Sequence, residues 1–498
     1  MKKLFFLLFA GILLFGASFS LAAQNFSGSI FSKSTQEPIP FAEITLGKNY
    51  GVISNTEGKF SINTEKATPT DSLKFYSLGY APKKIAVKDF NDQDAIYLEE
   101  KIDELEDVYL IDRSKIIPEE LMEKVLENAE NNYASAEAKM AVFERYSGTY
   151  EMKDMEVNIK KADFLSKKQQ NRFVEVVDSI ANASKGKPSE QYSESFYYLY
   201  KDKDANFKTQ LQKATKLANE EKSKESGKIL EKTLNSLTAN LDSDKTFKVK
   251  SGLFKLQDSL KLKEAIELST SDSILNENKA KSFEFKQNRE TFFTITGFDF
   301  IENYKRYKFT LKDVSGYKGE MVYVLGFEPD RGSAKYQGTL YISADTHAVI
   351  KMDYALLEGE KAAGMNMKFL FGINYKRDQA KGILIFQKNE EGKYLPKYIK
   401  KSARDYVYLD RNILFKENKE VGWFTSKPKL KFNFLIENLN HSTSEFLFID
   451  NQAISQADFE AIKPGKGIKL EKIKAYNSQI WKAYNILAPS KEIEEFEY

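Results

Sequence analysis

The clearest pattern in the chain is an alternation of apolar and mainly polar positions between residues 365 and 375. Met365, Met367, Phe369, Phe371 and Ile373 occupy every second position. A β-strand turns successive side chains to opposite faces, whereas an amphipathic helix repeats its apolar residues at intervals of three and four. The alternation therefore predicts one extended strand with a single apolar face, and these five residues are the candidate lining of an apolar groove.

Further strand patterns surround this segment and predict an antiparallel series. They lie at Met321–Phe327, Gly338–Ser343, Ala348–Tyr354, Ile383–Gln387, Tyr394–Ile399 and Leu430–Ile436. Consecutive strands with one apolar face must close on themselves or be covered by helices. Residues 140–450 are therefore expected to form a curved antiparallel sheet or half-barrel. Its Met-rich and aromatic inner face has two interpretations, a packed core or an open groove for a lipid or apolar peptide.

Helical patterns are fewer and predict a linker and an insertion. Pro118 suits the first position of a helix, and the apolar residues that follow fall on one face, at Leu121, Met122, Val125, Leu126 and Ala129. Residues 112–139 are thus expected to be a helical linker. Residues 203–245, rich in Lys, Glu, Ala and Leu, predict a helical insertion whose leucines suit a local core or, alternatively, a partner-binding coiled coil. The segments 247–262 and 283–300 have strand-like patterns.

The N-terminal region, residues 24–111, predicts a small sandwich. Short β patterns recur about every ten residues, at Ser29–Phe31, Ala42–Leu46, Gly51–Ser54, Lys59–Ile62 and Leu73–Tyr76. Turn residues separate these patterns, namely Pro38 and Pro40 in the first connection and Asn55 to Gly58 before Phe60. The glycines are interpreted as turn residues and receive no binding role.

These residues resemble a known family. The motifs Glu37-Pro38-Ile39-Pro40-Phe41-Ala42, Thr56-Glu57-Gly58-Lys59-Phe60 and Ser77-Leu78-Gly79-Tyr80, after Gly28 to Phe31, look like the carboxypeptidase regulatory-like domain, a transthyretin-like sandwich. The resemblance implies a non-catalytic module. The segment Leu98 to Ile111 also resembles the exit from such domains in outer-membrane receptors of Bacteroidetes-type bacteria. The second module resembles, through Val324 to Pro329 and Gly338 to Met352, the half-barrels of periplasmic lipoprotein carriers, which bind acyl chains in an apolar concavity.

The first 23 residues predict a cleaved secretory signal. Lys2 and Lys3 precede the apolar run Leu4–Phe15, and small residues follow up to Ala23. The run is shorter than the ~20 residues that span a bilayer, and no later stretch is long and apolar enough to do so. The predicted address is the periplasm or the periplasmic face of the outer membrane, with an extracellular location as the alternative.

Composition and charge narrow the possible partners. After removal of the two signal lysines, 73 basic residues face 72 acidic ones, which does not suggest a nucleic-acid-binding protein. The lysine pairs are scattered among acids and, taken as sequence, do not support binding to anionic membranes. Cysteine is absent, so disulfides, thiolate metal sites and cysteine nucleophiles are excluded. No cofactor or metal is expected.

The residues give little support for catalysis. The two histidines, His347 and His441, have no Glu at the spacing that a zinc peptidase needs, and no nucleophile motif accompanies them. Both are expected in turns or loops. Asp378, Asp405 and Asp410, with Arg404 and Arg411, are expected as solvated charges around strand ends. Residues 451–498 are expected to be a C-terminal tail.

The predicted protein is mainly β with a helical insertion, formally α+β. It has a transthyretin-like sandwich followed by a curved sheet or half-barrel. The predicted function is non-catalytic binding of an outer-membrane protein partner or a lipid-like, apolar ligand in the cell envelope. The alternative is a hydrolase that acts on envelope peptide, glycan or lipid.

Overall fold

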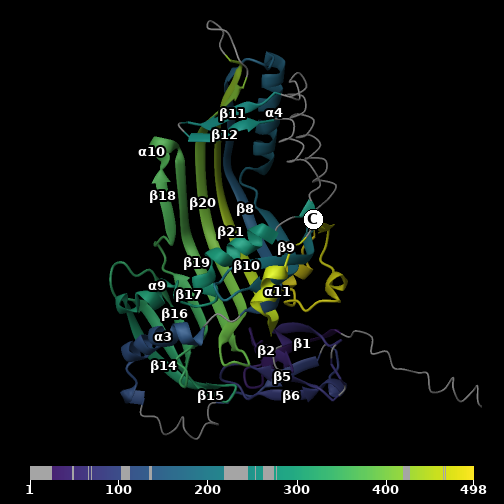
Figure 1. Ribbon diagram of the computed structural model, residues 1–498, viewed down its shortest axis with the longest axis vertical. Coiled ribbons are helices and arrows are strands. Elements are labelled where there is room, and N and C mark those ends of the chain that lie inside the picture. Colours follow the sequence, from purple (N-terminus) through teal and green to yellow (C-terminus); the bar gives the residue numbers. More distant parts are fainter. Residues whose placement is uncertain are drawn as a thin grey trace, which may run out of the picture. The chain divides into compact units, whose positions relative to one another are not determined.

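The computed structural model describes residues 25–497 with internal gaps (Figure 1). The gaps are residues 48–49, 66, 69, 93, 102–112, 134–136, 218–244, 253, 262–273, 276–277, 419–426, 464 and 466. The predicted signal segment lies outside the described residues. The chain forms two compact units. The first comprises residues up to Ser77, Ala81–Glu100 and Asn477–Ser490, and the second comprises Leu78–Tyr80, Lys101–Tyr476 and the residues from Lys491 onward.

The first unit is a β-sandwich of seven strands. They are β1 (Asn25–Ser32), β2 (Glu43–Leu46), β3 (Tyr50–Ile53), β4 (Lys59–Asn63), β5 (Ser72–Tyr76), β6 (Lys83–Ala86) and β7 (Asp94–Leu98). One sheet has the order β4-β1-β7 and the other β3-β2-β5-β6. Phe60 and Phe75, one from each sheet, meet edge to face in the core with ring centroids 5.7 Å apart. The predicted sandwich is confirmed, while its last two strands escaped the sequence prediction.

The C-terminal residues are not a separate tail, contrary to the prediction. Residues 477–490 complete the first unit, where Trp481 is buried. The Asn55 side chain donates to the carbonyl of Pro489 at 2.9 Å, and the backbone N–H of Asn63 donates to the side-chain oxygen of Asn485 at 2.6 Å. The helical turn α12 (Lys491–Glu494) then belongs to the second unit. Side-chain amides satisfied by distant backbone cannot be inferred from local patterns.

The second unit is built on one large, mainly antiparallel sheet. Its main path has the order β14-β15-β16-β17-β19-β20-β21-β8-β9-β10-β23, with β11, β12 and β18 joined at the edges. The strands are β8 (Ala138–Ala162), β9 (Ser189–Lys201), β10 (Phe207–Leu217), β11 (Phe247–Ser251), β12 (Phe254–Leu260), β14 (Tyr307–Tyr317), β15 (Glu320–Pro329), β16 (Tyr336–Ser343), β17 (Val349–Leu356), β18 (Ala363–Met367), β19 (Ile373–Lys388), β20 (Tyr394–Glu417), β21 (Lys429–Ala453) and β23 (Glu471–Ile473). A separate pair joins β13 (Ile274–Leu275) to β22 (Ile468–Lys469). The predicted curved antiparallel sheet is confirmed.

Helices and helical turns flank this sheet. They are α3 (Pro118–Asn132), α4 (Lys167–Ser184), α7 (Asn278–Gln287), α8 (Arg289–Phe292), α9 (Asp299–Glu302), α10 (Lys368–Phe371) and α11 (Gln456–Ala461). The predicted helix after Pro118 is confirmed, although Leu126 stays exposed while its four apolar neighbours are buried. These buried residues join the core of the second unit, so α3 is part of that unit and more than a linker.

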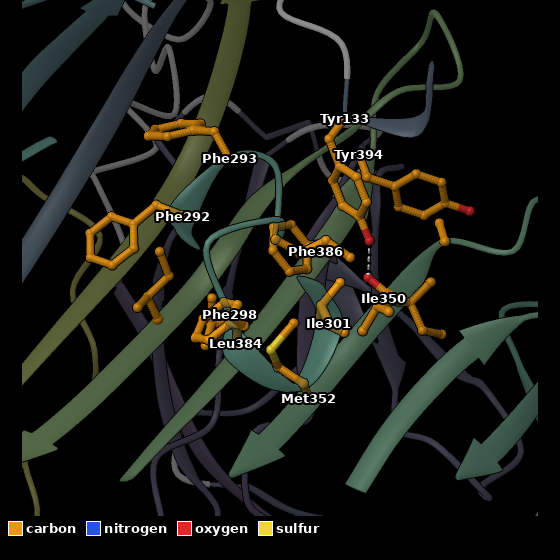
Figure 2. Close-up of a cluster of buried hydrophobic side chains, with 14 of the residues drawn as sticks. Tyr133, Phe292, Phe293, Phe298, Ile301, Ile350, Met352, Leu384, Phe386 and Tyr394 are labelled. Atoms are coloured by element: carbon orange, nitrogen blue, oxygen red, sulfur yellow. Dashed lines mark hydrogen bonds between the residues drawn. The ribbon is translucent and has the colours of Figure 1, made fainter. Parts of the chain in front are cut away.

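The core of the second unit is aromatic (Figure 2). Phe285 of α7 packs against Phe292 and against Phe446 of β21, with ring centroids about 6 Å apart. Tyr133, just after α3, donates its hydroxyl to the carbonyl of Val349 at 2.6 Å. Edge-to-face aromatic contacts add to the gain from burial. The helices α7 to α9 therefore fill one part of the sheet's core side as a solid plug.

The secondary structure differs from the prediction in two segments that contribute to this core. Residues 283–300, expected as strand, contribute instead to the helices α7 to α9. From these helices their aromatic side chains pack into the core. Residues 207–217, expected as part of the helical insertion, form β10, where Phe207, Thr209 and Leu211 alternate inward. The Lys-rich composition of the predicted insertion favours helix, and tertiary strand pairing overrides this preference in β10. Residues 218–244 of that insertion, which include its leucine series, lie outside the described residues.

Candidate functional site: the inner face of the large sheet

The five candidate groove residues lie on a hairpin and not on one strand. Met365 and Met367 belong to β18, the two phenylalanines belong to α10, and Ile373 begins β19. The two strands are antiparallel neighbours, in which Met365 pairs with Tyr375 and Met367 with Ile373. Residues that are directly opposite share a face of the sheet. Three of the five candidates are therefore on one side, although they are not on one strand.

The prediction of a continuous strand is wrong because Gly372 reverses the chain. Its φ of 62° is left-handed. An added Cβ there would lie 2.0 Å from the carbonyl oxygen of Asp410, so glycine alone fits. The helical turn before it leaves Phe369 at the surface, 98% exposed. The apolar alternation survives on both sides of the turn because paired strands keep a common face.

The side that these residues share is continuous with the core. Strand β20 pairs with β21 from Tyr398 to Lys416 without a register shift. Ile399, which is buried in the aromatic core, therefore shares its face with every second residue that follows it on β20, including Val407 and Leu409. Since Leu409 pairs with Ile373, β18 and β19 present the same face. We call this core-side surface the inner face.

Beyond the core, the inner face becomes apolar and only partly buried. Thirteen of the residues that the register places there are Met365, Met367, Ile373, Tyr375, Val407, Leu409, Ile413, Phe432, Phe434, Ile436, Met155, Val157 and Ile159. They come from five adjacent strands, whose long extension is visible in Figure 1. We call these thirteen residues the inner apolar face. This surface is the candidate for the open apolar groove that the sequence suggests.

Most of the inner apolar face was missed from the sequence. The signal was present at Met155, Val157 and Ile159, which alternate with Glu156, Asn158 and Lys160 as strictly as the 365–373 segment does. What the sequence could not supply was the pairing that brings β8 beside β21. More than two hundred residues of chain separate these two strands.

A polar band separates the core from the inner apolar face. A hollow of about 460 Å³ lies here, lined by aromatic residues of α8 and α9 on one side and by Arg377, Lys401, Ser442 and Ser444 on the other. Lys401 donates to the Asn288 side chain at 2.9 Å, and burial lowers the pKa of its ammonium. Lys381 and Asp299 also line the hollow, which thus combines an apolar wall with three basic residues and one acid, an excess of positive charge suited to the head of an anionic amphiphile.

The charges expected at strand ends are instead organised in mid-strand. Arg377 forms a two-pronged ion pair with Asp405 on the inner face, with N–O distances of 2.8 and 2.9 Å, and this hydrogen bonding raises the pKa of the guanidinium. Arg404 pairs with Asp378 at 2.5 Å, which lowers the pKa of that carboxyl. Arg411 also lies in mid-strand. The prediction of simply solvated charges is therefore wrong for these side chains.

The histidines do not converge on a reaction centre. His347 lies in the turn between β16 and β17, as predicted, and burial lowers its pKa. His441 lies within β21, exposed on the face opposite the core, so its assignment to a loop is wrong. Within the described residues, no three His, Asp or Glu side chains are grouped as metal ligands. No described helix is long and apolar enough to cross a membrane.

Residues 26–110 match the CarboxypepD_reg-like domain family. The first unit is thus a β-sandwich of the carboxypeptidase regulatory-like class, and that class is non-catalytic. Among solved structures, a LolA superfamily protein from Nitrosomonas europaea aligns at 10% identity over 70% of this chain and 98% of its own, with a TM-score of 0.20. The P. putida toluene transporter TodX aligns at 9% identity over 65% of this chain and 92% of its own, with a TM-score of 0.09. Both likenesses are weak, and no curated protein matches the chain.

Proposed function

We propose that this chain is an exported, non-catalytic cell-envelope protein that binds a lipid-like ligand along the inner apolar face. One observation carries the proposal: the core side of the sheet continues beyond its aromatic plug as an apolar, partly exposed surface on five strands. A sheet face of this composition is normally covered, either by chain or by ligand. This surface supports the binding function that we predict from the sequence.

The polar band favours an amphiphile over a plain hydrocarbon. Lys401 and Arg377 line the hollow at the core end of the inner apolar face, so an anionic head would lie there while its chains extend along Leu409 and Ile436. Cations in a partly desolvated site bind anions more strongly than they would in water. A protein partner is the second candidate, because the same surface suits an apolar peptide segment. The hydrolase alternative finds no catalytic arrangement in the described part of the chain.

The test is extraction of ligand from protein purified out of the native envelope, followed by mass spectrometry. We expect wild-type protein to carry a lipid in about equimolar amount. Leu409→Asp places a charge on the inner apolar face and should remove it. Leu414→Asp is the matched control, since Leu414 lies on the same strand and faces the opposite side. Wild-type protein without lipid, or equal lipid loss in both variants, would overturn the proposal.

A further inference from the structure

Four of the exposed large apolar side chains of the second unit lie on two hairpins at one end of the long strands. Phe369 and Leu370 of α10 are 98% and 73% exposed, and Phe254 and Leu256 of β12 are 49% and 60% exposed. Figure 1 shows α10, β11 and β12 at the same end of β20, away from α3 and α9. We call these four residues the apolar tip. Two of them are neighbours in the chain, and the other two lie more than a hundred residues earlier.

The two hairpins are fixed to each other, so the tip is a preformed surface. The Arg411 guanidinium donates to the carbonyl of Phe371 at 2.5 Å and to the carbonyl and hydroxyl of Ser251 at 2.7 and 2.8 Å. The rings of Phe254 and Phe371 lie 5.5 Å apart. One side chain thus ties α10 to the β11–β12 hairpin, which lowers the entropic cost of binding through the tip.

The tip is also basic. Residues 247–260 and 363–371 together hold four lysines, Lys248, Lys250, Lys255 and Lys368, and one acid, Asp258, which pairs with Lys255 and Lys248 at 2.5 and 3.7 Å and leaves a net excess of positive charge. Lys368 directly precedes Phe369, and Lys255 separates Phe254 from Leu256. Taken as sequence, the scattered lysines gave no support for an anionic membrane. The fold changes this view because it brings Lys368 and the lysines of residues 247–260 to the same group of exposed apolar side chains, the apolar tip.

We propose that the apolar tip docks onto the surface of a lipid bilayer that contains anionic lipid. Phe369 and Leu370 enter the interface, while the lysines face the headgroups. Apolar side chains flanked by lysines bind such interfaces through combined burial and electrostatic attraction. An almost fully exposed phenylalanine suits a deformable lipid surface better than a preformed protein pocket. This inference is independent of the ligand on the inner apolar face.

The test is co-sedimentation of the full mature chain with vesicles of phosphatidylcholine, with and without phosphatidylglycerol. We expect binding to the anionic vesicles that weakens with salt. The double variant Phe369→Ser/Leu370→Ser should bind at least about tenfold more weakly, from the apolar area lost. Phe283→Ser is the matched control, because Phe283 on α7 is 62% exposed and lies outside the tip. It should bind like wild type.

Two further measurements separate docking through the tip from ligand binding on the inner apolar face and from self-association. Phe369→Trp should show a blue-shifted emission on addition of anionic vesicles, because its indole leaves water. Leu409→Asp should keep vesicle binding, so that failure of the ligand proposal and failure of docking are distinguished. The proposal is overturned if wild-type protein does not bind anionic vesicles or if the double variant binds as wild type does. It is likewise overturned if light scattering shows self-association through the tip in place of vesicle binding.

Discussion

Two substitutions on one face of β20 test whether the inner apolar face is open. Ile399 and Leu409 point to the same side of the same strand, ten residues apart, but Ile399 is fully buried in the core whereas Leu409 is only partly buried. We expect Ile399→Asp to destabilise the second unit severely. Leu409→Asp should leave a folded protein, because a partly exposed surface allows the new carboxylate to be hydrated.

The difference in stability between the two variants can be estimated from how deeply each side chain is buried. An aspartate with no partner in the core must be protonated at pH 7, about 3 units above its ordinary pKa, which costs ~4 kcal/mol at ~1.4 kcal/mol per unit. Loss of the buried isoleucine surface removes a further ~2 kcal/mol. At ~2 °C per kcal/mol or somewhat less in a unit of this size, the melting temperature of Ile399→Asp should fall by about 10 °C. Leu409→Asp should lower it by only a few degrees.

The pH dependence of stability distinguishes the two variants independently. Burial raises the pKa of the introduced Asp in the folded state, so the folded protein binds more protons than the unfolded one, and stability falls as pH rises. Between pH 7 and pH 5, Ile399→Asp should regain ~2 to 3 kcal/mol relative to wild type, whereas Leu409→Asp should not. The assay is thermal melting followed by circular dichroism at both pH values. A collapse of Leu409→Asp equal to that of Ile399→Asp would refute an open inner face.

Three other outcomes are expected. Arg145→Met should lower the free energy of unfolding in chemical denaturation by ~3 to 5 kcal/mol, because it leaves the buried carboxylate of Glu194 without the guanidinium that contacts it at 2.6 and 2.8 Å. The double variant with Glu194→Leu should recover much of the loss, and no recovery would contradict this reasoning. N-terminal sequencing of native protein should begin at Ala23 or Gln24, whereas an intact first residue would refute signal cleavage. EDTA should shift the melting temperature by less than about 2 °C, and a larger drop would reveal a cation site.

Some elements were readable from the sequence because their signals are local. The sandwich strands around Phe60 and the helix after Pro118 follow from spacing, turn residues and capping preferences that act within a few positions. The hairpin of β16 and β17 and the strands after Ile383 follow for the same reason. The general architecture, a small sandwich before a larger antiparallel sheet, could therefore be predicted.

Other features required the tertiary structure because they depend on which strands become neighbours. The alternation at Met365 to Ile373 indicated a shared face correctly, yet only the left-handed Gly372 shows that a turn divides it. The spacing of the aromatic residues at 283–300 does not distinguish helix from strand. The helix forms because it places these side chains in the core. Pairing of β8, β21 and β20 joins distant apolar residues into one face, and Arg411 joins two distant hairpins into one tip. Local patterns determine the elements and their apolar sides, whereas long-range register determines which of those sides become core, groove or exposed surface.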